Sequence, residues 1–499
     1  MKYFFLTIIF SLQSFSMVVA ANDTIINPRY DSIQNSGNLD AIMNRLKNEK
    51  NNSDSGFVVA HFGDSHIEGD FLTSVIRKNL QGVFRSAGEG VLFPYSVCKG
   101  GYGPKSLSTT ISGNWNCASI VKNPEKYPIG MTGHTLVTTD KKATISFVYN
   151  PTTEVPCGKN NIFEKVTIWH SGKNFKLILV KNGSADAIYI DTTGNGNGLY
   201  RTIITNYRIG TELKLCFDTT NGDTIFNFHG ISFENPSVHG LQYNHFGVVG
   251  ATFLQLVNHQ DYTLAQLHAI KPDLLIFSYG SNESYDTYFK IDDYSTKVSL
   301  FIKRIKAEFP GITIIFTDTP DTRSRNRIPP NTTHINDVMQ LIAKSNGAGF
   351  WDLNKIMGGK NSMLYWLANG LAGKDKLHFT RTGYELQGNL FSLAFLKIYS
   401  AKFDNSVQPV CDSLQNKINA QLATLSGKTV GSNPSTANAT AKTNASSTSG
   451  YQVHYVQKNE TLSTIAKQYG VTTQQLCKLN HLTEKSVLHI NQKILIGKK

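Results

Sequence analysis

The stretch FVVAHFGDSHIEGD, residues 57–70, decides the fold class because it joins an apolar run to a tight polar turn. The apolar residues 57–63 predict a buried strand, and the spacing of apolar residues over 71–80 predicts a helix directly after the turn. The same alternation returns late in the chain, and it predicts an α/β fold in which helices cover a parallel sheet. The later elements are expected at 273–280 and 312–318 as strands, and at 294–309 and 383–399 as helices.

The turn itself supports two different chemical hypotheses. If Asp64, His66 and Asp70 are the functional side chains, the run is the first ligand set of a two-metal phosphoesterase. If Ser65 is the functional side chain, the run is the nucleophile turn of a hydrolase. The partners found elsewhere in the chain have to decide between these hypotheses.

Residues 1–20 have the layout of a secretory signal peptide. Lys2 precedes an apolar run over residues 3–10, and the small residues Ala20 and Ala21 follow. The apolar run is too short for a membrane-spanning helix, and no later segment reaches that length. We therefore expect an exported protein without a transmembrane segment, located in the periplasm, with secretion or the cell surface as the alternatives.

The charge and the cysteines argue against several classes of protein. The formal net charge is +13, but the positive residues are scattered and form no basic helix or aromatic-interleaved stripe. An acidic cell-wall polymer is therefore a better expected partner than nucleic acid. The six cysteines include no C-x-x-C pair, so zinc ribbons and thioredoxin chemistry have no support. The sequence predicts no cofactor, and it assigns no oligomeric state.

Changes in residue composition along the chain indicate its division into domains. Short β-rich runs separated by turn signals fill residues 106–237, which predicts a β-sandwich inserted into the α/β domain. Such a module could bind glycans, shape a substrate groove or serve only the structure. Residues 426–450 contain few large apolar residues and predict a linker. The α/β domain is expected in two parts, 21–105 and 238–425, and a further module at 451–499.

The metal hypothesis lacks its partners. Two divalent ions about 4 Å apart need several His and Asp ligands beyond a single run. A Gly-Asn-His turn is expected, but the segment YGSNES at 279–284 has no histidine, and no G-x-H-x-H run occurs. The sequence therefore predicts no metal site.

The serine hypothesis finds its partners near the end of the α/β domain. A serine hydroxyl needs a base, and the base needs a carboxylate that orients it. The segment KDKLHFTRTGY, residues 374–384, places Asp375 three residues before His378 on a loop that precedes a predicted helix. Donors for an oxyanion are offered by GVVGATF at 247–253 and by YGSNE at 279–283.

Four blocks follow one another along the chain: GDS with Ser65, GVVGATF with Gly250, GSNE with Asn282, and DKLH with Asp375 and His378. In this order they resemble the blocks of the SGNH hydrolase family, also called GDSL hydrolases. The resemblance implies a three-layer α/β/α domain with Ser65 as nucleophile, His378 as general base and Asp375 as the residue that orients it. It also implies an oxyanion hole formed by Ser65, Gly250 and Asn282. Two departures are visible: the β insert separates the glycine block from the first block, which leaves Gly250 and Gly247 as candidates, and a glutamate follows Asn282 where an aspartate is common.

The other polar residues of the opening stretch have simpler interpretations. A histidine in a strand-to-helix turn more often makes a local hydrogen bond than a substrate contact, and we expect this of His66. His61, Glu68 and Asp70 show no partners in the sequence. We expect them to be solvated or to cap a helix, with Asp70 well placed to cap the helix that follows.

The C-terminal segment 453–497 reads as strand, helix, helix and strand, and it is similar to a LysM domain. That resemblance implies binding of glycans that contain N-acetylglucosamine. The implied groove consists of Asn459, Glu460, Thr461 and Leu462 in the first loop and of Ile490 and Asn491 before the last strand.

Together these features resemble bacterial peptidoglycan O-acetylesterases. The resemblance implies removal of O-acetyl groups from peptidoglycan by a Ser-His-Asp acyl-enzyme mechanism. Two alternatives share this chemistry, namely an acetylesterase of another polysaccharide and a peptidoglycan O-acetyltransferase. An alternative of another class is a wall-binding protein with an inactive hydrolase site.

Overall fold

The chain is described by a computed structural model, in which two compact units, Met1–Val430 and Gly431–Lys499, each have a core of their own. The expected signal peptide, nearly all of the expected linker and Asn459, Ile490 and Asn491 lie outside the described residues. No helix of the described chain is long and apolar enough to cross a membrane. The structure describes residues 25–50, 56–98, 104–150, 162–172, 175–180, 188–192, 199–217, 224–323, 327–426, 451–456, 460–480, 482–483, 486, 488 and 493–498.

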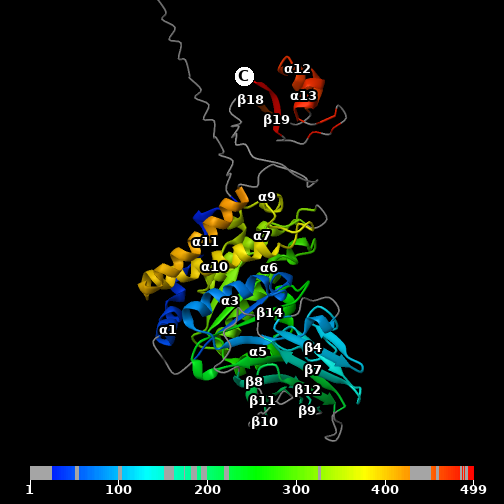
Figure 1. Cartoon of the computed structure of the whole chain (residues 1–499), viewed down its shortest axis with the longest axis vertical. Coiled ribbons are helices and arrows are strands. Elements are labelled where there is room, and N and C mark those ends of the chain that lie inside the picture. The colour runs from blue at the N-terminus through cyan, green and yellow to red at the C-terminus, as the bar shows by residue number, and fades with distance from the viewer. Residues whose placement is uncertain are drawn as a thin grey trace, which may run out of the picture. The chain divides into compact units, whose positions relative to one another are not determined.

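A six-stranded sheet forms the centre of the first unit, as the alternation of strands and helices predicted (Figure 1). Its strands are parallel except for the first, which pairs antiparallel to its neighbour. Across the sheet the order is β1 (Ile33–Gln34), β17 (Gly349–Trp351), β16 (Thr313–Thr317), β15 (Leu274–Ser278), β2 (Phe57–Gly63) and β14 (Leu241–Gly247).

Helices cover both faces of this sheet because successive strand residues point to opposite sides. In β2, Phe57 and Val59 join one buried cluster, and Ala60 and Phe62 join the other. The unit is therefore a three-layer α/β/α domain. The first cluster packs under α1 (Asp40–Lys50), α3 (Phe71–Phe84), α8 (Leu353–Met357), α9 (Ser362–Ala368), α10 (Arg381–Lys402) and α11 (Gln408–Ser426), and the second under α4 (Phe253–Asn258), α5 (Gln260–Ile270), α6 (Ile291–Glu308) and α7 (Thr332–Ser345).

Two antiparallel sheets form the inserted β module (Figure 1). Aromatic and aliphatic side chains of both sheets meet in one core, so the module is a β-sandwich. The larger sheet has the order β10 (Ile188–Thr192), β11 (Leu199–Arg208), β8 (Ile162–Ser171), β13 (Phe226–Glu234), β6 (His134–Thr138) and β5 (Asn116–Ser119), and the smaller sheet has β4 (Leu107–Ser112), β7 (Thr144–Tyr149), β12 (Glu212–Phe217) and β9 (Phe175–Val180).

The larger sheet also takes in β3 (Gly88–Leu92), which pairs antiparallel with β13 and lies before the module boundary expected at residue 106. A disulfide joins Cys98, in the short 3-10 helix Tyr95–Cys98 after β3, to Cys117 of β5. Of the described cysteines, Cys216, Cys411 and Cys477 carry free thiols. The entry of the chain into the module is thus tied to it by both a strand and a disulfide.

The second unit has the strand-helix-helix-strand order that the sequence predicted. β18 (Tyr451–Tyr455) pairs antiparallel with β19 (Lys493–Lys498), and between them lie α12 (Leu462–Gln468) and α13 (Thr473–Asn480). The Thr461 hydroxyl accepts a hydrogen bond from the backbone N–H of Thr464 and so caps α12. Leu462, which was expected in the glycan groove, is 3% exposed and packs in the core of this unit.

Candidate active site

Three loops converge at one edge of the central sheet. The neighbouring strands β15, β2 and β14 are parallel and in register, so that Ser278, Gly63 and Gly247 form one row at their carboxyl ends. The loops that follow this row carry Ser65, Gly250 and Asn282. This arrangement explains how segments more than 180 residues apart in the sequence contribute to one site.

The turn after β2 presents Ser65 at the first residue of the short helix α2 (Ser65–Glu68). Asp64 caps this helix, since its carboxylate accepts the backbone N–H of His66 at 2.9 Å. Gly63 must be glycine because an added Cβ would lie 2.3 Å from Cγ1 of Ile67 and 2.7 Å from the carbonyl oxygen of Ser278. Close packing of this turn leaves the Ser65 side chain half-buried.

The loop before α10 brings a histidine and a carboxylate to this serine. Ser65 Oγ lies 2.9 Å from His378 Nε2, and His378 Nδ1 lies 2.7 Å from Asp375 Oδ2. Asp375 Oδ1 also accepts the backbone N–H groups of Leu377 and His378, both at 3.1 Å. The three predicted residues therefore form a continuous hydroxyl–imidazole–carboxylate chain.

The surroundings of Asp375 keep its carboxylate charged, so that it can stabilise a positive charge on His378. Partial burial raises the pKa of Asp375, but hydrogen bonds from His378 and from the two backbone N–H groups outweigh burial and hold the pKa below its ordinary value. The carboxylate stays ionised near neutral pH and can accept the Nδ1–H of His378. Nε2 then has a lone pair for the serine proton, which is the requirement for nucleophilic catalysis by a hydroxyl.

The oxyanion candidates lie on the two neighbouring loops. Asn282 Nδ2 donates to the carbonyl oxygen of Ala251 at 2.8 Å, which ties its loop to the residue after Gly250. Gly250 has φ +79°, a conformation that favours glycine. Gly247, the other candidate, serves packing, because a Cβ there would lie 2.0 Å from the backbone nitrogen of Glu68. Gly250 therefore stays the candidate donor that the resemblance implies.

A buried glutamate, Glu68, holds the loop that contains Gly250. Glu68 is 3% exposed, and its carboxylate accepts the backbone N–H of Val249 at 2.8 Å. Burial raises its pKa to about 7. The expectation that Glu68 is solvated or merely caps a helix is therefore wrong, because its partner lies 181 residues away in the sequence.

Glu283 holds the other end of the same loop. Its carboxylate accepts the backbone N–H of Phe253 at 2.6 Å and that of Gly280 at 3.1 Å. Burial raises its pKa to about 7. The glutamate that departs from the expected family pattern thus supports both loops that carry the oxyanion candidates.

Two further expectations for the opening stretch, those for His61 and Asp70, are also wrong. His61 is buried between the Tyr243 hydroxyl, at 2.8 Å from Nδ1, and Ser278 Oγ, at 2.6 Å from Nε2. Asp70 precedes α3, but its side chain accepts hydrogen bonds from Thr73 Oγ1 and from the Arg77 guanidinium, not from the helix backbone. The partners of His61 lie on other strands and are invisible as a local sequence pattern, whereas those of Asp70 lie three and seven residues along the chain.

His66 lies beside the proposed base without facing a local partner. Its Nδ1 lies 2.9 Å from the hydroxyl of Tyr384 in α10, so the expected local hydrogen bond is wrong for the ring, although its backbone N–H bonds locally to Asp64. The ring centroid lies 5.4 Å from that of His378. Burial lowers the pKa of His66 to about 3, which keeps the ring neutral. The neutral ring of His66 thus packs against the ring of His378.

The acidic and histidine side chains of the opening stretch do not converge. Asp64, His66 and Asp70 bind different partners, and no group of three His, Cys, Asp or Glu side chains in the described residues is arranged to hold a metal ion. The contacts of Ser65 with His378 and of His378 with Asp375 are those that the serine hypothesis requires.

Part of the expected glycan groove of the second unit can be described. Glu460 Oε2 lies 2.7 Å from His454 Nε2, and His454 Nδ1 lies 3.0 Å from the Tyr469 hydroxyl. Thr461 is exposed. This network fixes the loop before α12 and leaves Thr461 at the surface.

Comparison with known proteins agrees with both units. Residues 235–386 match the GDSL-like Lipase/Acylhydrolase family, and residues 454–497 match the LysM domain. The first match contains Gly250, Asn282, Asp375 and His378, whereas Ser65 precedes it because the β module interrupts the domain. No curated protein matches the chain.

Among solved structures, a peptidoglycan O-acetylesterase matches with a TM-score of 0.56 at 20% identity, and the match covers 76% of this chain and 99% of that one. The lipase/acylhydrolase from Enterococcus faecalis matches over 32% of this chain and 77% of its own, at 20% identity and a TM-score of 0.26. An acetylxylan esterase from Geobacillus stearothermophilus matches over 32% and 73%, at 18% identity and a TM-score of 0.25. The predicted resemblance to SGNH hydrolases and to LysM domains is confirmed, as is the α/β fold class.

Proposed function

Because this chain joins a GDSL-like acylhydrolase domain to a LysM domain, we propose that it is an exported serine esterase that removes O-acetyl groups from peptidoglycan. The observation that carries the proposal is the chain of contacts from Ser65 Oγ to His378 Nε2 and from His378 Nδ1 to Asp375 Oδ2, at 2.9 and 2.7 Å. These contacts supply a nucleophile, a base and a group that orients the base.

In the proposed reaction Ser65 Oγ attacks the acetyl carbonyl carbon while His378 Nε2 takes the serine proton. The carbonyl oxygen becomes negative and is stabilised by the backbone N–H groups of Ser65 and Gly250 and by the Asn282 amide. His378 then gives the proton to the sugar oxygen as the ester bond breaks. A water molecule, deprotonated by His378, attacks the acetyl-serine and releases acetate.

The domain combination supports peptidoglycan as the substrate. LysM domains bind glycans that contain N-acetylglucosamine, and the fold of the first unit is similar over 76% of this chain to that of a peptidoglycan O-acetylesterase. Both point to a wall glycan that carries ester groups. A location outside the cytoplasm follows from the same substrate and from the signal-like residues 1–20.

Two candidate functions compete with this one. An O-acetyltransferase would use the same acetyl-serine and differ only in the acceptor. A wall-binding protein with an inactive site is disfavoured by the intact hydrogen bonds among Ser65, His378 and Asp375.

The test is acetate release by the full chain from O-acetylated peptidoglycan, from the same polymer after mild base has removed its esters, and from acetylated xylan. We expect acetate from native peptidoglycan, none from the base-treated polymer, and slower release from xylan. Ser65→Ala is the matched control and should release none above background. Faster release from xylan contradicts the peptidoglycan assignment, and transfer of acetyl groups to an added glycan in preference to water identifies a transferase.

A further inference from the structure

A cavity of about 220 Å³ lies between the candidate active site and the β module. On the α/β side it is lined by Glu68 of α2 and by Val248 and Val249, which directly precede Gly250. On the module side it is lined by Ala118, Ser119, Val121, Lys122 and His134, and the Cys98–Cys117 disulfide and Tyr95 complete the lining. Because Val248 and Val249 directly precede Gly250 and Glu68 follows Ser65 by three residues, the cavity adjoins two of the segments that carry the candidate site.

A second cavity, of about 310 Å³, adjoins the first and shares the disulfide and Lys122 with it. Aromatic and amide side chains line it, together with a second lysine. Trp115 is held in place because its Nε1–H donates to the carbonyl oxygens of Ser112 and Thr144. The lining residues of the second cavity outside the disulfide are Val97, Trp115, Asn116, Lys122, Asn123, Lys126 and Tyr127.

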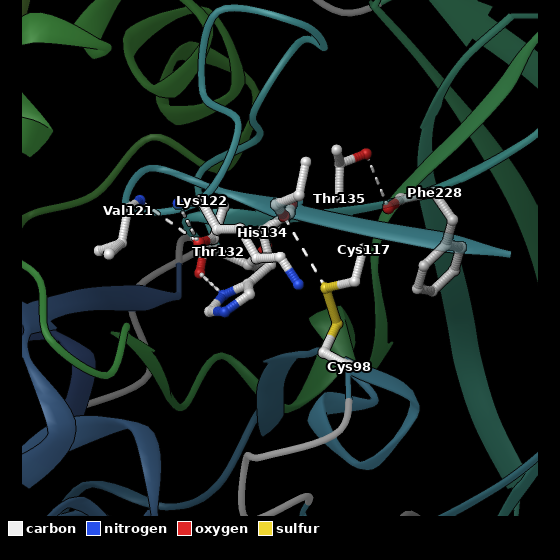
Figure 2. Close-up of a disulfide and its surroundings, with 10 residues drawn as sticks. Cys98, Cys117, Val121, Lys122, Thr132, His134, Thr135 and Phe228 are labelled. Carbon is white, nitrogen blue, oxygen red and sulfur yellow. Dashed lines mark hydrogen bonds between the residues drawn. A yellow bond between two sulfur atoms is a disulfide. The ribbon is translucent and has the colours of Figure 1, made fainter.

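Lys122 sits on a fixed turn at the boundary of the two cavities. Its backbone N–H donates to the carbonyl oxygen and to Oγ of Ser119, each at 3.1 Å, and its carbonyl oxygen accepts the backbone N–H of Ser119 at 2.9 Å. Figure 2 shows Lys122 close to His134 and to the disulfide. Lys122 is exposed, and within the described part of the chain no ion pair occupies its ammonium group.

The charges that line the two cavities favour an anionic ligand. Lys122 and Lys126 provide the positive charges. The acidic side chain of the lining, Glu68, has a pKa raised by burial to about 7 and already accepts the N–H of Val249. Glu125 is near this surface in the sequence, but its carboxylate faces His259 at 3.9 Å. An ammonium group beside aromatic rings and amides suits a glycan with a carboxylate on a peptide attached to it.

We propose that the two cavities form a subsite for a glycan unit whose attached peptide carries a free carboxylate, next to the acetylated position, and that Lys122 recognises this carboxylate. The proposal rests on the proposed function and adds a substrate class to it: acidic glycans, such as muropeptides with free carboxylates, are preferred over neutral acetylated polysaccharides. The anionic group lies over the boundary turn, and the pyranose ring lies against the Trp115 side of the second cavity.

The test compares the full wild-type chain with Lys122→Gln, Lys122→Arg and the control Lys141→Gln, which changes an exposed lysine of the module that lines neither cavity. The substrates are O-acetylated muropeptides, the same muropeptides after amidation of their carboxylates, and p-nitrophenyl acetate. We expect Lys122→Gln to raise KM for the carboxylated muropeptides by about five- to tenfold, the loss of one charge-assisted hydrogen bond. Lys122→Arg, Lys141→Gln and all rates on p-nitrophenyl acetate should stay near wild type.

Amidated muropeptides should show the raised KM already with the wild-type protein and no further rise with Lys122→Gln. An equal KM of wild type and Lys122→Gln on carboxylated muropeptides overturns the subsite. Inhibition of p-nitrophenyl acetate hydrolysis by O-deacetylated muropeptides separates this outcome from failure of the proposed function. If wild type releases no acetate from muropeptides, the proposed function fails, while an inhibition constant that depends on Lys122 still supports the subsite and one that does not overturns it.

Discussion

Glu68 connects the serine turn to the loop of the oxyanion candidate. It lies three residues after Ser65 in α2, and its carboxylate accepts the N–H of Val249, the residue before Gly250. A carboxylate that accepts a backbone N–H fixes the orientation of the peptide groups on both sides of it. In the proposed mechanism Glu68 is therefore a positioning residue, which acts on the reacting oxygen only through Gly250.

The prediction for this residue separates positioning from folding. Glu68→Ala should lower kcat on p-nitrophenyl acetate by about ten- to a hundredfold with little change in KM, since a misplaced oxyanion donor affects the transition state more than the ground state. Glu68→Gln keeps an acceptor oxygen for Val249 and should retain most of the activity. A wild-type kcat in Glu68→Ala would contradict a positioning role of Glu68. A Glu68→Gln variant as slow as Glu68→Ala would contradict the idea that an acceptor oxygen for Val249 is what matters.

At the scale of elements, the ends of neighbouring strands gather buried carboxyl groups. Asp64 follows β2, Glu283 follows β15, and Glu68 packs against the end of β14. Burial raises the pKa of Asp64 to about 6 and those of Glu68 and Glu283 to about 7. Glu68 and Glu283 accept backbone N–H groups of the loop that contains Gly250 and so connect it to the other two loops, whereas Asp64 accepts an N–H within its own turn.

A raised pKa in the folded state has a defined effect on stability. Between pH 4.5 and about 7 the folded protein binds more protons at Glu68 than the unfolded chain does, so the stability from this group is present below pH 4.5 and is lost as pH rises through 7. Burial lowers the pKa values of His61 and His66 to about 3, which gives the opposite slope. The diagnostic quantity is therefore the difference between a variant and the wild type.

We predict that Glu68→Gln becomes more stable relative to wild type as pH rises from 5 to 8, by up to about 3 kcal/mol in the free energy of unfolding. Urea unfolding at both pH values measures this difference, with Lys141→Gln as a control that should show no change. A constant difference at the two pH values would contradict the raised pKa of Glu68.

The sequence predicted those elements whose signals are local. The apolar run and turn at 57–65 predicted β2 and the position of Ser65, and the three-residue spacing predicted that Asp375 meets His378. The roles of Glu68 and His61 were missed because their partners, Val249 and Tyr243, lie more than 180 residues away. Contacts of this kind arise from the parallel register of strands, which no local pattern encodes.

The strand β3, at a domain boundary, is a second feature that local sequence patterns could not predict. Its sequence GEGVL contains two glycines and gives no clear strand signal, yet it pairs with β13 from the other end of the insert. Gly88 and Gly90 have φ of +129° and +93°, and a Cβ at Gly88 would lie 2.2 Å from the carbonyl oxygen of Phe233. These glycines permit the close approach of the two strands.

At the scale of the whole molecule, the proposed function assigns catalysis and wall binding to separate units. Ser65, Asp375 and His378 all belong to the first unit, and the LysM match belongs to the second, which has its own core. Because the units have separate cores, loss of the second should leave the catalytic geometry intact. A second binding module raises the effective concentration of the enzyme at a polymer without adding contacts at the reacting ester.

Removal of residues 431–499 should therefore leave kcat and KM on p-nitrophenyl acetate unchanged. Sedimentation with insoluble peptidoglycan should fall by about tenfold or more, because one of two linked binding sites is lost. The full chain with Ser65→Ala is the control for binding without turnover. Unchanged sedimentation of the shortened protein would assign wall binding to the first unit instead.

The central claim is that Ser65 is a nucleophile activated by His378. Mass spectrometry of peptides from the full chain, after treatment with a serine-reactive fluorophosphonate, measures this directly. We predict one phosphonyl adduct on Ser65 in the wild type, none at that position in Ser65→Ala, and a labelling rate reduced by about a thousandfold in His378→Ala. An unlabelled Ser65 in the wild type, or equal labelling of Ser65 in His378→Ala, would contradict the claim.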